Sequence, residues 1–247
     1  MRWQLVGPRR ALSLFVLGFC TTIFILVGLA QGGAWARCFY ALAGAYGVAF
    51  FALAAEWFWA RWFAMGLSAS GITLAILGII TTGWNAGLAI WGGIHLGIWA
   101  PLLGDAMAQR YEGQTAWRER YRLDEYGVAR IKRAVKGAAT ALPTLIFFSL
   151  APREGRGLLL WALPVLAAVG LAGVVRMRFW GVVVLAGTGV AAALAALVPA
   201  DALLQMQGSL LAVRSVGLFG ALALAFAVSP FVVPAYRWLT KKSIVDS

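Results

Sequence analysis

Charged residues are scarce in this chain of 247 residues. They make up 12% of it, against roughly 25% in an average soluble domain, and 62% of the residues are hydrophobic. A soluble fold of this length has too little interior to hide so many apolar side chains. The composition therefore excludes a soluble enzyme, a disordered chain and a nucleic-acid-binding domain, and it predicts transmembrane helices.

Cysteine, histidine and acidic residues are also few. Cys20 and Cys38 fall at different depths of the first two apolar runs, which predicts free thiols and excludes a disulfide scaffold. The sequence has no Cys and His cluster with metal-site spacing, no pair of carboxylates within an apolar run and no phosphate-binding glycine-lysine motif. A catalytic role is therefore disfavoured, although the sequence does not decide it.

Eight apolar runs predict the fold, an all-α polytopic bundle of about eight transmembrane helices. The predicted spans are 11–30, 36–55, 62–82, 86–103, 137–151, 157–175, 179–199 and 211–236. The first run follows Arg9 and Arg10 but is longer than the apolar core of a signal peptide, so we expect a retained helix. The fifth run is short, and we expect its helix to begin within the basic segment before Lys136.

The basic residues predict the orientation. With both chain ends in the cytoplasm, 17 of the 21 Lys and Arg residues fall on cytoplasmic segments. This distribution follows the positive-inside rule. Most tryptophans fall near predicted span ends, where indole rings are common in membrane interfaces. Compact loops and an Ala- and Gly-rich composition favour the bacterial cytoplasmic (inner) membrane.

The predicted spans divide the chain into three parts. An N-terminal four-helix bundle covers 1–103, a basic cytoplasmic segment covers 104–136, and a C-terminal four-helix bundle covers 137–247. From Leu123 onward the basic segment has the spacing of an amphipathic helix. Anionic lipid headgroups or another membrane subunit are the expected contacts of its cations, although a solvated helix without a partner is also open. The cations concerned are Arg130, Lys132, Arg133 and Lys136.

His95 lies near the middle of the fourth run, and Trp91 and Trp99 share its helical face at spacings of four. An ionisable side chain inside a membrane is costly and suggests a function. His95 could ligate a haem- or chlorophyll-type cofactor between the two indoles, or relay protons. The other interpretation is a neutral histidine bonded to a neighbouring helix. The expected partners are hydroxyls of the third run: Ser68, Ser70 and Thr73.

Glu56 and Arg61 flank the turn between the second and third runs, and their closeness in sequence predicts an ion pair there. The function favoured by these features is that of a non-catalytic accessory, scaffold or assembly subunit of a larger membrane complex. A small-solute transporter or channel is the first alternative, with Asn85, Thr81 and Thr82 along the path. A cofactor-binding subunit using His95 is the second. Nucleic acid is not an expected partner.

Overall fold

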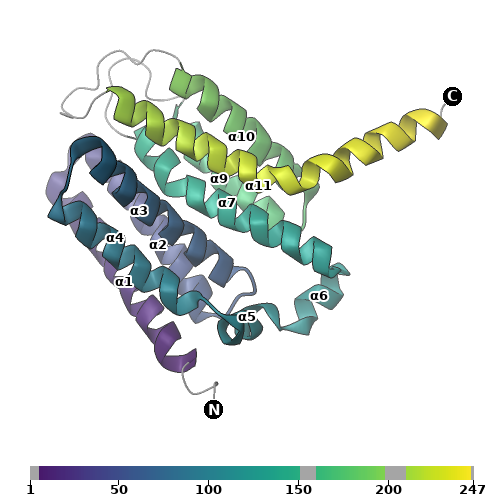
Figure 1. Cartoon of the computed structure of the whole chain (residues 1–247), viewed down its shortest axis with the longest axis horizontal. Coiled ribbons are helices and arrows are strands. Elements are labelled where there is room, and N and C mark those ends of the chain that lie inside the picture. Colours follow the sequence, from purple (N-terminus) through teal and green to yellow (C-terminus); the bar gives the residue numbers. More distant parts are fainter. Residues whose placement is uncertain (1–5, 151–159, 198–209, 246–247) are drawn as a thin grey trace.

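The computed structural model describes residues 6–150, 160–197 and 210–245, and helices are the only regular elements in these ranges (Figure 1). The long helices are α1 (Val6–Gln31), α2 (Gly33–Ala54), α3 (Ala60–Thr82), α4 (Ala86–Trp99), α7 (Glu125–Leu150), α9 (Ala162–Val175), α10 (Phe179–Leu197) and α11 (Leu210–Val245). The short ones are the 3-10 helix η2 (Ala100–Leu102), α5 (Asp105–Glu112) and α6 (Thr115–Tyr121). The prediction of an all-helical fold is confirmed.

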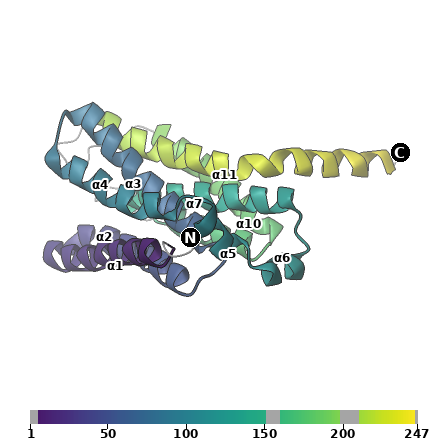
Figure 2. The ribbon, with the colours of Figure 1, turned by 60° about the horizontal axis from the view of Figure 1, so that its bottom comes forward.

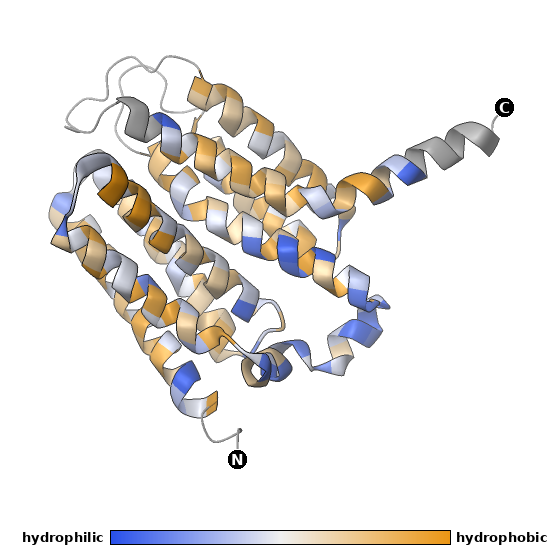
Figure 3. Ribbon diagram, viewed as in Figure 1, coloured by the Kyte–Doolittle hydropathy of each residue, from blue (hydrophilic) through white to orange (hydrophobic). Residues whose placement is uncertain are grey.

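Apolar residues cover most of these helices, as Figure 3 shows. Five described helices are long and apolar enough to cross a membrane: α1, α2, α3, α10 and α11. A sixth span is reached if α4 with η2 and α5 are counted together, although the chain bends by 73° between them. α9 is apolar but short, and α7 carries charges in its first half. The chain is therefore a multi-pass helical membrane protein.

The breaks between the first helices follow from local sequence. α1 and α3 end where Gly32 and Gly83 adopt positive φ angles of 60° and 85°, a conformation that glycine adopts without steric cost. Asn85 begins α4 by accepting a hydrogen bond from the Leu88 N–H on its side-chain oxygen, at 3.2 Å. The predicted boundaries of these spans lie within a few residues of the observed ones.

α7 is the central helix of the molecule. It packs against α2 and α3 on one side and against α9 and α11 on the other (Figures 1 and 2). Glycines permit the close approach: a methyl group on Gly66 would meet the backbone of Lys136, and one on Gly137 would meet that of Ala223. The helix begins well before residue 137, as the short fifth run predicts. The expected boundary between 104–136 and 137–247 therefore lies inside one continuous helix.

Most polar side chains collect at one end of the bundle, which we call the charged end. The α2–α3 turn, η2, α5, α6 and the first turns of α7 lie there, and much of the blue in Figure 3 falls on α5, α6 and the start of α7. The start of α1 lies at the same end (Figure 1). Trp3, one of the tryptophans near predicted span ends, and Arg153 and Arg156, two of the four basic residues not expected on cytoplasmic segments, lie outside the described residues.

Candidate functional site

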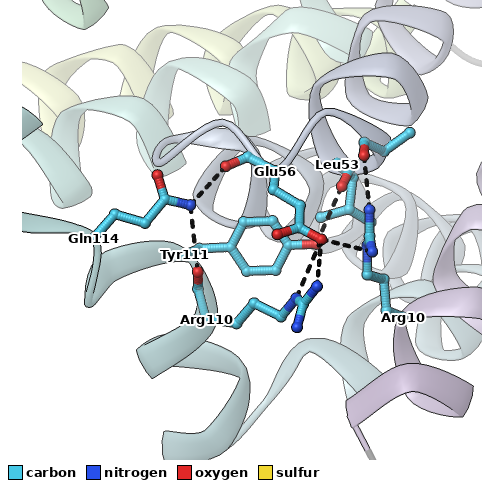
Figure 4. Close-up of polar contacts among 7 residues, drawn as sticks. Arg10, Leu53, Glu56, Arg110, Tyr111 and Gln114 are labelled. Atoms are coloured by element: carbon cyan, nitrogen blue, oxygen red, sulfur yellow. Dashed lines mark hydrogen bonds and ion pairs between the residues drawn. The ribbon is translucent and has the colours of Figure 1, made fainter. Parts of the chain in front are cut away.

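Glu56 organises the first of two carboxylate clusters at the charged end (Figure 4). Its Oε1 atom accepts from Arg10 Nη1 at 2.7 Å and from Arg110 Nη2 at 2.6 Å. Gln114 Nε2 donates to the Glu56 backbone carbonyl at 3.0 Å. These contacts join α1, the α2–α3 turn and α5. The predicted pair between Glu56 and Arg61 is wrong, because the chain after η2 turns back and brings Arg110 of α5 to Glu56, while Arg61 pairs with Glu112.

Glu56 also ends α2 in an unusual backbone conformation. Its φ is 56°, the left-handed region that glycine normally occupies after a helix. The Trp57 N–H bonds to the Ala52 carbonyl at 3.1 Å and the Glu56 N–H to the Leu53 carbonyl at 3.3 Å, as in a Schellman motif. A non-glycine residue pays about 1–3 kcal/mol for such a conformation. The glutamate side chain forms the ion pairs with Arg10 and Arg110, which a glycine at this position could not form.

Glu112, at the end of α5, forms the second cluster. Its carboxylate pairs with the Arg61 guanidinium and accepts from Lys132 Nζ at 2.8 Å. Arg61 also donates through Nε to the Leu102 carbonyl at 2.7 Å, at the end of η2. Burial alone would raise the pKa of Glu112. The hydrogen bond from Lys132 and the positive charges of Lys132 and Arg61 together outweigh it, so the pKa is lowered.

The two clusters fix α5 between both halves of the chain. Glu112 connects α3, through Arg61, to α7, through Lys132. The sequence points to Glu56 but suggests the wrong partner for it, and Glu112 lies among polar residues with no motif spacing, so the sequence does not point to it. The charged end is therefore an ordered set of ion pairs between helices, and not a hydrophilic loop without contacts to the bundle.

The four cations predicted to dock onto lipid or a partner do not share one exposed surface. Lys132 points inward to Glu112, and Lys136 is half-buried where α7 crosses α3. Arg130 and Arg133 are exposed, and the Arg133 guanidinium lies 5.6 Å from the ring centre of Phe226. Tyr126 is four residues before Arg130 on the same face and is 76% exposed. We call Tyr126, Arg130 and Arg133 the α7 face.

His95 is fully buried in contacts with its neighbours. Its Nε2 lies 2.5 Å from the Tyr46 hydroxyl, and its Nδ1 lies 2.8 Å from the Trp91 carbonyl. The bonded partner is thus Tyr46 on α2 and not a hydroxyl of α3. Trp91 packs on the imidazole with 4.1 Å between ring centres, and the backbone of Gly71 closes another side. Trp99, the other predicted wall, is half-buried one turn further on.

The residues expected along a transport path lie away from His95. Thr81 and Thr82 are exposed at the end of α3 and donate to carbonyls of their own helix, Leu77 and Gly78, at 2.8 Å. Asn85 is used as the N-cap of α4. The structure therefore places these three side chains together at the α3–α4 turn, engaged in local hydrogen bonds.

An apolar groove, which we call the α2–α9 groove, has a volume of about 1330 Å³. α2 and α9 form its walls, and α7 contributes its floor. The wall residues are mostly small: Ala41, Gly44, Ala45 and Val48 on α2, and Val165, Ala168, Val169 and Ala172 on α9.

The groove ends differ in polarity. Trp161 lies at one end, where the Arg37 guanidinium stands 4.6 Å from its ring centre. The other end reaches the charged end of the bundle, where Phe58 and Trp117 stack at 4.3 Å. Trp62, expected in an interface belt, is instead fully buried beside them. Sequence reasoning missed the groove because its residues come from segments far apart in the chain.

Comparisons with protein-family models, with curated proteins and with solved structures find no match to this chain.

Proposed function

We propose that this chain is a non-catalytic accessory or scaffold subunit of a larger membrane complex, in the bacterial cytoplasmic membrane. We also propose eight crossings with both chain ends in the cytoplasm. The positive-inside distribution supports this orientation, since 17 of the 21 Lys and Arg residues then lie on cytoplasmic segments. The charged end would be the cytoplasmic end.

The observation that supports the scaffold function most directly concerns the segment from α5 to the start of α7, which is fixed to the bundle and exposed on one face. The segment from α5 to the start of α7 is held to the bundle through Glu56 and Glu112, yet it exposes the α7 face. Aromatic and arginine side chains are enriched where proteins bind one another. A rigid, exposed surface costs a partner little ordering entropy, which favours docking.

The polar groups of the bundle give the alternatives less support. Cofactor ligation by His95 would require breaking its contact with Tyr46 and displacing the packed ring of Trp91. A transport path through Asn85, Thr81 and Thr82 would require freeing oxygens that bond to their own helices or caps. The ion pairs at the charged end likewise serve to join helices.

Site-specific photocrosslinking in native membranes tests the docking surface. A photoreactive residue replacing Tyr126 is expected to give a covalent adduct with a discrete second polypeptide. A probe at Gln109, exposed on α5 outside the α7 face, serves as the control. Arg130→Glu with Arg133→Glu should abolish the Tyr126 adduct. Equal adducts from both positions, or adducts only with a second copy of this chain, would overturn the proposal.

Thiol labelling of intact cells tests the orientation. In a Cys20→Ala, Cys38→Ala background, Trp84→Cys should react with an impermeant maleimide from outside. Trp84 is 79% exposed in the α3–α4 turn, and α3 has its other end at the charged end. Glu119→Cys, exposed on α6, should react only after the membrane is permeabilised. The reverse pattern would exclude the proposed orientation.

A further inference from the structure

We infer that the α2–α9 groove binds one anionic phospholipid from the cytoplasmic leaflet, with its acyl chains along the groove and its headgroup at the charged end. The inference rests on the proposed orientation, with the charged end in the cytoplasm, and is independent of the scaffold function. The proposed occupant of the groove is a lipid and not a helix of a partner protein.

The first argument is the uncovered apolar surface. Val48 on α2 and Val165 and Val169 on α9 are 49%, 61% and 44% exposed, although all three line the groove. Small neighbours such as Ala45 and Ala168 leave the space between the walls open. In a bilayer this surface must be covered by acyl chains or by another apolar chain.

The second argument is the positive charge at one end of the groove. Arg120 and Arg176 line this end, and both are exposed. Neither forms an ion pair with a carboxylate of the described residues. Glu56 also reaches the groove, but Arg10 and Arg110 together outweigh its negative charge. The rim therefore has an excess of positive charge, which complements a phosphate headgroup of the anionic cytoplasmic leaflet.

The third argument is the group of aromatic side chains that lies beside these arginines. Trp57, Trp117 and Tyr121 line the same end of the groove, and Trp57 is 51% exposed. Indole and phenol groups favour the depth at which headgroups meet acyl chains. The groove is thus apolar along its length, aromatic near the charged end and cationic at its rim. This order matches the acyl chains, the interfacial region and the phosphate headgroup of an anionic lipid.

The charge at one end of the groove favours a lipid over an apolar helix. An apolar transmembrane helix offers no anionic group to Arg120 and Arg176, whereas the headgroup of an anionic lipid does. Flexible acyl chains can also follow an open groove without a matching surface of their own.

Native mass spectrometry of the purified chain, with added lipid, tests the inference. Phosphatidylglycerol and phosphatidylcholine with identical acyl chains are the probes. We expect one phosphatidylglycerol to be retained about tenfold more strongly than phosphatidylcholine, a difference of about 1.4 kcal/mol. Arg120→Gln with Arg176→Gln should remove this preference. Arg122→Gln with Arg178→Gln removes the same charge from the same two segments outside the groove and should preserve it.

A second pair of variants tests the acyl-chain part. Ala168→Phe fills the groove and should reduce retention of both lipids, whereas Leu166→Phe, on the same helix outside the groove, should not. Equal retention of both lipids by the unmodified chain, or equal losses in a variant and its matched control, would overturn the inference. A tightly held polypeptide that is released only by Ala168→Phe would identify a helix as the occupant instead. Lipid adducts and added subunits differ in mass, so failure here and failure of the scaffold function are distinguishable.

Discussion

Glu112 and Arg61 form an ion pair between the end of α5 and the start of α3, with only 12% and 6% of their side chains exposed. Lys132 of α7 joins the same carboxylate. One glutamate therefore connects the two halves of the bundle at the charged end. This relationship makes the segment from α5 to the start of α7 a fixed part of the molecule.

Glu112→Ala should destabilise the fold strongly. Removing one partner of a buried ion pair leaves the other charge uncompensated, which typically costs about 3–5 kcal/mol. Here the uncompensated group is Arg61. The measurement is the free energy of unfolding in detergent micelles. Glu119→Ala, an exposed acid on α6, should change it by less than about 0.5 kcal/mol, and similar losses in both variants would contradict the account.

The same carboxylate should make stability depend on acidic pH. The pKa of Glu112 is lowered in the folded chain, so its contribution is fully present above the usual value near 4.5 and is lost as the pH falls below that. The unmodified chain should therefore approach the Tm of Glu112→Gln as the pH is reduced from 6 towards about 3. Glu119→Gln is the control. A constant Tm difference over this range would show that Glu112 does not titrate as expected.

Tyr46→Phe should destabilise the N-terminal helices without changing their packing volume. The change leaves His95 Nε2 buried without its hydroxyl partner, which costs about 1–3 kcal/mol. Tyr40→Phe on the same helix removes a hydroxyl from a side chain that is 44% exposed, and should be nearly neutral. Thermal unfolding of the two variants side by side provides the measurement. An unchanged Tm in Tyr46→Phe would mean that the hydroxyl contributes nothing to the fold.

Gly71→Ala should be more damaging than Gly93→Ala, although both replace a helical glycine. A methyl group on Gly71 would overlap the imidazole ring of His95, whereas one on Gly93 meets nothing within 4 Å. Alanine in an open helical position gains roughly 0.5–1 kcal/mol over glycine. Gly93→Ala should therefore unfold at an equal or higher temperature than the unmodified chain, and Gly71→Ala well below it. The opposite order would contradict the observed packing of α3 on α4.

The sequence predicts the helices better than it predicts their partners. Runs of apolar residues are local signals, as are the glycines after α1 and α3, so the bounds of α1 to α4 are close to the predicted ones. The early start of α7 follows from the same periodicity. The pairing of Glu56 with Arg110 instead of Arg61 depends on how the chain turns between η2 and α5, which no local pattern indicates.

The other differences between the predicted and the observed contacts arise because residues far apart in the sequence become neighbours in the fold. His95 bonds to Tyr46 because α2 passes beside α4, and run lengths do not encode which helices are neighbours. Lys132 and Arg133 are adjacent in sequence, yet Lys132 faces Glu112 and Arg133 is exposed, because consecutive residues of a helix point in different directions and only Lys132 is directed to α5. The α2–α9 groove likewise exists only after both halves of the chain are packed together.

Native mass spectrometry of the chain extracted gently from its own membrane tests the central claim, the scaffold function, most directly. The account predicts an assembly containing this 26.4 kDa chain together with at least one different polypeptide. That polypeptide should be lost when Arg130 and Arg133 are both replaced by glutamate. A chain that remains a monomer or an assembly of identical copies, under extraction that keeps other complexes of the same membrane intact, would contradict it.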